Sequence, residues 1–186
     1  MQVTFLTGNQ NKINSAKSAF SKYPEIELVY EKTETIEIQS LDVQEVAEYA
    51  VIEASNRLCK NVFKLDVGYY FEALNGYPGA FIKYFDKVLS SEDFLYLIDG
   101  KSRKVTIREC LSYCEPNGKP VSFVAELDAS VALKPEGEGG SVDRIIKYDG
   151  FENTQASSNY DDVVKYWNEK LDHYDRLAKY LVKKNK

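Results

Sequence analysis

The chain has 186 residues, of which 44% are hydrophobic and 28% are charged, and its formal net charge is −5. This length suits a single domain over residues 1–186, and no apolar run approaches the roughly 18 residues of a membrane span. The acidic balance argues against nucleic-acid binding, and residues 1–4 lack the basic and apolar regions of a signal peptide. We therefore expect a cytoplasmic protein that has neither a membrane nor nucleic acid as a partner.

The three cysteines, Cys59, Cys110 and Cys114, are an odd number, and the chain has a single histidine. A zinc site built from cysteine and histidine is therefore not expected. We expect reduced, structural thiols, with Cys110 and Cys114 on one face of an alternating strand.

The chain opens with an apolar run, Val3–Leu6, that predicts a strand, followed by helical apolar spacing from Ile13 to Phe20. The turn between them reads Thr7-Gly8-Asn9-Gln10-Asn11-Lys12. Free N–H groups and the positive end of a helix dipole at such a turn can bind an anion. Thr7 and Asn9 can add donors and Lys12 a positive charge, although the turn can equally be a plain connection.

The remaining elements follow in chain order and predict an α/β or α+β fold. Strands are expected at 26–30, 62–65, 104–113 and 121–133, and helices at 43–58, 81–89, 91–98 and over about the last 25 residues. Residues 66–79 are interpreted as loop-rich, 136–141 as a glycine-rich turn, and Pro116-Asn117-Gly118 as a hairpin turn.

Two acidic residues stand beside predicted regular elements, Glu37 before the second helix and Asp66 directly after an apolar strand. Open α/β sheets bind ligands at the carboxyl ends of their strands. Two carboxylates there can hold Mg²⁺ together with substrate phosphates and water, and one of them can deprotonate a water. The alternative is that both are solvated surface acids.

Two further features carry weaker signals. Asn75-Gly76-Tyr77-Pro78-Gly79 predicts a rigid turn, with Lys83 one helical turn further on and able to face a phosphate. His173 is the only histidine and lies on the C-terminal helix, so no histidine-based triad can be assembled from the sequence.

In this order, the motifs resemble those of the inosine triphosphate pyrophosphatase family, enzymes that hydrolyse deaminated purine nucleoside triphosphates. Residues 7–12 match its Thr-Gly-Asn-x-x-Lys opening, Glu37 lies in a segment similar to Pro-Glu-Ile-Gln, and Asp66-Val67-Gly68 resembles Asp-Ser-Gly. Later segments are similar to Leu-x-Gly-x-Pro-Gly at 74–79, to Gly-Tyr-Asp-Pro around Asp143, and to Ser-His-Arg at 172–174.

The resemblance implies a mixed central sheet with flanking helices, two lobes around a deep cleft, and a homodimer. It implies that Mg²⁺ assists attack of water on the α–β phosphoanhydride of a nucleoside triphosphate, releasing a monophosphate and pyrophosphate. Asp66 is the implied catalytic residue, and Glu37 and Asp66 are the implied metal ligands. The expected substrate-binding residues are Thr7, Gly8, Asn9, Lys12, Lys83, Asp143, Arg144, His173 and Tyr174.

Several positions depart from the family pattern. Leu65 stands where an acid usually precedes Asp66, Gly140 and Val142 replace aromatic residues, and Tyr174 replaces an arginine. The phosphate end of the site is therefore kept and the base end rebuilt, which predicts an altered or relaxed base preference. The alternatives are a catalytically degenerate nucleotide-binding or regulatory homologue, and a likeness of fold alone.

Overall fold

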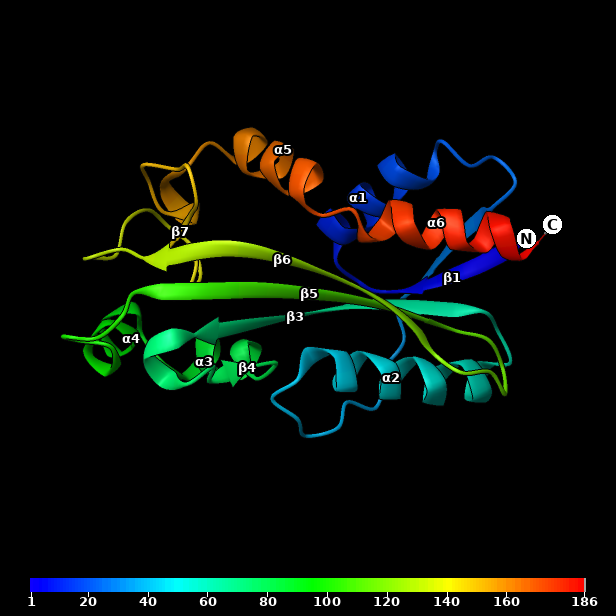
Figure 1. Ribbon diagram of the computed structural model, residues 1–186, viewed down its shortest axis with the longest axis horizontal. Helices are drawn as coiled ribbons and strands as arrows, with labels where there is room; N and C mark the ends of the chain where they lie inside the picture. The colour runs from blue at the N-terminus through cyan, green and yellow to red at the C-terminus, as the bar shows by residue number, and fades with distance from the viewer. Residues whose placement is uncertain (186) are drawn as a thin grey trace. The chain divides into compact units, whose positions relative to one another are not determined.

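The computed structural model describes residues 1–185 as an α/β protein with a mixed sheet and flanking helices (Figure 1). The sheet order is β2-β1-β3-β5-β6-β7, and β4 pairs with β3. Within the described residues, no helix is both long and apolar enough to span a membrane. The strands are β1 (Gln2–Leu6), β2 (Glu27–Glu31), β3 (Val62–Phe71), β4 (Pro78–Gly79), β5 (Lys104–Cys114), β6 (Val121–Val131) and β7 (Ile146–Tyr148).

The helices are α1 (Gln10–Phe20), α2 (Val43–Leu58), α3 (Ile82–Val88), α4 (Ser91–Leu97), α5 (Tyr160–Lys170) and α6 (His173–Lys184). The chain groups into two compact units. The first unit comprises residues 1–66, 109–125 and 171–185, and the second comprises residues 67–108 and 126–170.

The first unit is built on the parallel pairing of β1 with β2 and with β3, in which Phe5 lies opposite Phe63. α1 and α6 pack side by side on one face of this part of the sheet, and α2 lies on the other (Figure 1). Because strand side chains alternate between faces, Phe63 and Leu65 point towards α1 and α6, whereas Val62 points towards α2.

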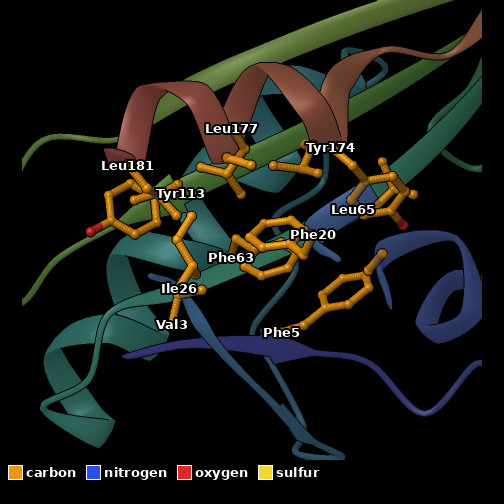
Figure 2. Close-up of a cluster of buried hydrophobic side chains, with 13 residues drawn as sticks. Val3, Phe5, Phe20, Ile26, Phe63, Leu65, Tyr113, Tyr174, Leu177 and Leu181 are labelled. Atoms are coloured by element: carbon orange, nitrogen blue, oxygen red, sulfur yellow. The ribbon is translucent and has the colours of Figure 1, made fainter. Parts of the chain in front are cut away.

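The larger core of this unit is aromatic (Figure 2). Phe5 stacks on Phe63 with 4.3 Å between ring centroids, Phe63 stacks on Phe20, and Tyr174 meets Phe5 edge-on. Leu177 and Leu181 of α6 are fully buried against the same cluster. The apolar residues of α6 recur every three or four positions, so they lie on one face of the helix. This face packs on the core.

The second unit contains the remaining halves of β3, β5 and β6, to which β4 and β7 add. α4 begins with a capping box in which Ser90 and Asp93 satisfy each other's backbone N–H groups, as their spacing in the sequence predicts. Phe94 of α4 is buried and stacks on Phe71 of β3.

Most predicted elements are confirmed, one prediction is wrong, and one strand was missed. Residues 66–79 are not loop-rich throughout, because β3 continues through Asp66 to Phe71; the short strand β7 was not expected. Cys110 and Cys114 are buried free thiols, and Cys59 is an exposed one. The single domain and the two-lobed cleft stay predictions.

Candidate active site

The turn after β1 is organised by its own polar side chains. The Asn9 side chain accepts hydrogen bonds from the backbone N–H groups of Asn11, at 2.9 Å, and Lys12, at 3.3 Å, and so caps α1. The Thr7 hydroxyl accepts from the Asn9 N–H at 3.1 Å. Thr7 and Asn9 thus shape the turn, and their contact with a phosphate stays a prediction.

Gly8 has a close neighbour, because a β-carbon built there would lie 3.1 Å from the side chain of Lys32. The aliphatic part of Lys32 therefore covers the glycine, and a second lysine stands beside the turn in addition to Lys12. No sequence motif pointed to Lys32.

Lys12 reaches from the first turn of α1 towards β3. Its ammonium donates to the carbonyl oxygen of Leu65 at 2.7 Å. Burial lowers the pKa of Lys12, while the carboxylates of Asp66, Glu109 and Glu37 act in the opposite direction. Lys12, which is expected to bind phosphate, therefore lies near several charged side chains.

The strand register explains why these charges meet. β1 ends at Leu6, and the pairing of Phe5 with Phe63 places that end beside Lys64. β3 continues beyond this point, so Lys64 and Asp66 lie next to the turn, where β1 no longer pairs with them. By alternation both side chains point to the face that also carries Val62.

Lys64 joins the two acidic residues that the sequence singled out. Its ammonium lies 2.5 Å from Oε1 of Glu37 and 3.1 Å from Oδ1 of Asp66. The other oxygen of Asp66, Oδ2, is buried and has no hydrogen-bond partner. Burial raises the pKa of Asp66, against the lowering effect of Lys64 and Lys12.

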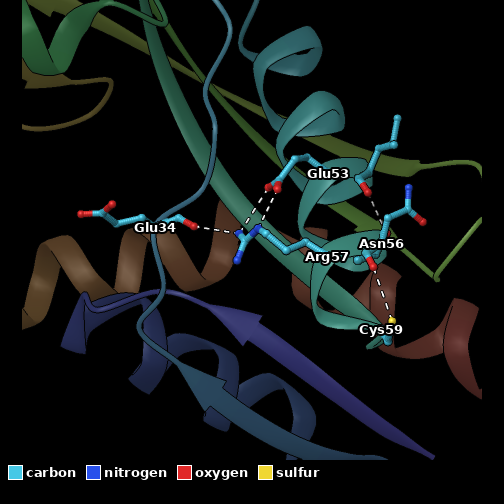
Figure 3. A network of polar contacts seen from close by, with 7 residues as sticks. Glu34, Glu53, Asn56, Arg57 and Cys59 are labelled. Carbon is cyan, nitrogen blue, oxygen red and sulfur yellow. Dashed lines mark hydrogen bonds and ion pairs between the residues drawn. The ribbon is translucent and has the colours of Figure 1, made fainter.

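The loop that carries Glu37 is attached to α2 by Arg57 (Figure 3). Arg57 donates to the backbone carbonyl of Glu34 at 3.0 Å and pairs with Glu53, one turn earlier in the helix, at 2.6 Å. The connection between β2 and α2 is therefore fixed to the helix three residues before Glu37.

On the other face of β3, Glu109 of β5 lies against α6. Its carboxylate is 3.4 Å from Nε2 of His173, and its side chain is 19% exposed. Burial raises the pKa of Glu109 to about 7, and burial lowers the pKa of His173 to about 4. Neither imidazole nitrogen of His173 has a hydrogen-bond partner. Between pH 4 and 7, therefore, the neutral forms of both Glu109 and His173 are favoured.

Tyr174 and Leu65 are core residues. Tyr174 is 6% exposed, its ring lies beside Phe5 (Figure 2), and its hydroxyl is 3.4 Å from the backbone oxygen of Lys12. Leu65 is 4% exposed in the same cluster. The structure thus gives Tyr174 a packing role, and its contact with a base stays a prediction, as does that of the buried His173.

The remaining expected substrate residues belong to the second unit. Lys83 is exposed on α3. Asp143 accepts from the Gln155 side chain at 2.9 Å, and burial raises the pKa of this carboxyl. Arg144 is half-buried, and its Nε has no hydrogen-bond partner.

A β-carbon on Gly140 would meet the Asp86 carboxylate at 2.9 Å, and this carboxylate accepts from the Val142 N–H at 2.8 Å. The space beside Gly140, where the resembling family has an aromatic ring, is therefore taken by Asp86.

The donors around Asp66 fit a magnesium ion only in part. Within residues 1–185 no three acidic, histidine or cysteine side chains gather as a metal site. Mg²⁺ can be held by one or two protein carboxylates when phosphate oxygens and water complete its octahedron. The unpartnered Oδ2 of Asp66 suits such an ion, one that arrives with a triphosphate.

Sequence reasoning missed Glu109 and Lys64 as members of this cluster. Both signals were present, because Glu109 interrupts the apolar alternation of Val105, Ile107, Leu111 and Tyr113, and Lys64 interrupts Val62–Leu65. A charged residue on an otherwise buried face is more informative than one on a polar face.

The fold and the cluster define an α/β protein with paired lysines and carboxylates at its first β–α turn. A model of the Ham1 family matches residues 3–165, and the chain belongs to that family. The resemblance found in the sequence is thereby confirmed.

Two relatives are named dITP/XTP pyrophosphatase. The one from Methanopyrus kandleri is 34% identical over 167 residues, covering 89% of this chain and 88% of its own. The one from Ignicoccus hospitalis is 31% identical over 183 residues, covering 97% and 96%. A HAM1 protein from Coxiella burnetii has a TM-score of 0.79 at 16% identity, covering 98% of this chain and 99% of its own, which shows the shared fold.

Proposed function

We propose that the protein hydrolyses nucleoside triphosphates to a nucleoside monophosphate and pyrophosphate. The observation that carries this proposal is the convergence of Lys12, Lys64, Glu37 and Asp66 where β1 ends and α1 begins. The names of the two relatives, which cover most of this chain, point to the same chemistry.

Lys12 and the N-terminus of α1 hold the phosphates. Lys12 adds a full positive charge to the dipole of α1, and a partly desolvated ammonium binds an anion more strongly than a hydrated one. Lys32, which lies over Gly8, is a second cation on the solvent side of the turn.

Asp66 accepts the proton of the attacking water. Its Oδ2 is a buried acceptor with no partner, and burial raises the pKa of this carboxyl, which makes it a better base than a solvated aspartate. The water oxygen forms a bond to the α-phosphorus as the bond to the bridging oxygen breaks and pyrophosphate leaves. Mg²⁺, when bound, neutralises charge on the phosphate oxygens.

The test is pyrophosphate release from a panel of nucleoside triphosphates, with and without Mg²⁺. Asp66→Asn keeps the side-chain shape and removes the base, so we expect loss of turnover with retained nucleotide binding. Asp99→Asn, an exposed aspartate of the second unit, is the matched control. If Asp66→Asn turns over like the parent, the assigned role of Asp66 is wrong; if the parent binds nucleotide without hydrolysing it, the protein is a binding homologue.

We further propose an altered or relaxed base preference. Asp86 fills the space beside Gly140, Val142 is 4% exposed, and Tyr174 is packed in the core, so these three positions lack the base contacts that the family pattern leads us to expect. Selectivity requires polar groups that a wrong base leaves unpaired. A preference of a hundredfold or more for inosine over adenosine triphosphate would contradict this. The homodimer and the cytoplasmic location stay predictions.

A further inference from the structure

Lys64 is an unusual residue for its position. It lies between Phe63 and Leu65 in β3, and it is 8% exposed while Val62 and Phe63 are 0% exposed. A buried ammonium is costly unless it is paired with opposite charge. The surroundings of Lys64 therefore show which charges compensate it.

Two carboxylates from separate segments provide that compensation. Glu37 comes from the loop before α2, and Asp66 lies two residues further along β3. The ammonium sits between them, 2.5 Å from the first and 3.1 Å from the second. A divalent cation held by Glu37 and Asp66 together would compete with this ammonium for the same two carboxylates.

We propose that Lys64 is the resident cation of this site and that its ammonium keeps free divalent metal out of the position between Glu37 and Asp66. A metal ion then binds only together with nucleotide, and not between these two carboxylates. The inference rests on the proposed function for the role of these two carboxylates.

Simple electrostatics supports the exclusion. Glu37, Asp66 and Lys64 carry a net charge of −1 as a group, and loss of the ammonium changes it to −2 at an unchanged pair of carboxylates. Mg²⁺ needs near-ideal octahedral geometry and gives up water reluctantly. A cation already held by both carboxylates therefore has the advantage over a hydrated ion from solution.

The experiment measures Mn²⁺ binding by electron paramagnetic resonance without nucleotide. We expect the parent to bind Mn²⁺ at least tenfold more weakly than Lys64→Met, whose side chain has similar length and no charge. Lys64→Arg keeps a cation and is expected to match the parent, whereas adding Asp66→Asn to Lys64→Met is expected to abolish the new site.

Lys60→Gln is the matched control, because Lys60 forms an exposed pair with Glu31 at 2.7 Å in the same unit. It is expected to bind Mn²⁺ like the parent. Mn²⁺ should also raise the melting temperature of Lys64→Met and leave that of the parent unchanged.

Two results would overturn the inference. One is tight Mn²⁺ binding by the parent without nucleotide that Asp66→Asn removes. The other is a folded Lys64→Met protein that gains no Mn²⁺ affinity. If Lys64→Met does not fold, the parent is titrated with Mn²⁺ in the presence and absence of a non-hydrolysable nucleoside triphosphate. The inference requires that Mn²⁺ binds only when the nucleotide is present. Because the nucleotide-free titrations involve no turnover, a failure of the proposed hydrolysis is recognised separately.

Discussion

Replacing Glu109 with glutamine is expected to stabilise the protein relative to the parent by an amount that grows with pH. Glu109 is 19% exposed beside His173, and burial raises its pKa from the ordinary 4.5 to about 7. Protonated Glu109 therefore favours the folded state. That contribution is complete below pH 4.5 and is lost as the pH rises to about 7.

The magnitude follows from the two pKa values. Each pKa unit corresponds to about 1.4 kcal/mol, so the free energy of unfolding loses about 3 kcal/mol over this range. His173 acts in the opposite sense, because burial lowers its pKa from 6.5 to about 4 and stability falls as the pH drops through that interval. The contributions of Glu109 and His173 thus oppose each other between pH 4.5 and 6.5.

The assay is urea unfolding of the parent and Glu109→Gln at several pH values between 4 and 8. The difference between the two proteins isolates Glu109 together with its coupling to His173, and it is expected to rise by about 3 kcal/mol from pH 4.5 to 7. Glu126→Gln, which removes a half-exposed strand glutamate paired with Arg108, is the control. A difference between parent and Glu109→Gln that does not change with pH would refute the protonated state of Glu109.

Three further outcomes are expected. Lys12→Ala should weaken binding of every nucleoside triphosphate equally, by about 1.5–3 kcal/mol in calorimetry; a loss confined to one base would contradict a phosphate role. Arg57→Ala should speed hydrogen exchange around Glu34 while leaving global stability nearly unchanged, because its ion pair is solvent-exposed; unchanged exchange would mean that the loop needs no anchor. Tyr174→Ala should lower the free energy of unfolding by about 3–5 kcal/mol and Tyr174→Phe by less than about 1 kcal/mol. Equal effects of the two substitutions in denaturation would mean that the hydroxyl, and not the packing of the ring, stabilises the fold.

The local elements of this protein could be predicted from its sequence. The apolar spacing of residues 43–58 defines α2, the spacing from Ile13 to Phe20 defines α1, and the Ser90–Asp93 capping box starts α4. Each of these features depends on residues within one or two helical turns of each other, and such short-range patterns can be recognised in a single sequence. The acids Glu37 and Asp66 were singled out on similarly local grounds.

Other features depended on which strands pair. Asp66 was expected just after a strand, yet it lies inside β3. This strand runs past the end of β1 because β5 and β4 also pair with it. The charged side chains near Asp66 come from distant segments. Lys12 binds the Leu65 carbonyl, 53 residues away in the sequence, and Glu37 pairs with Lys64, 27 residues away.

The sequence by itself determined the first β–α turn, the main helices and the acidic residues beside that turn, because each follows from short-range spacing. Only the tertiary structure decided that Lys64 stands between Glu37 and Asp66 and that Glu109 packs beside His173. The charge on a side chain is set by its type, but its partner and its pKa are set by the residues that strand pairing and helix packing bring next to it.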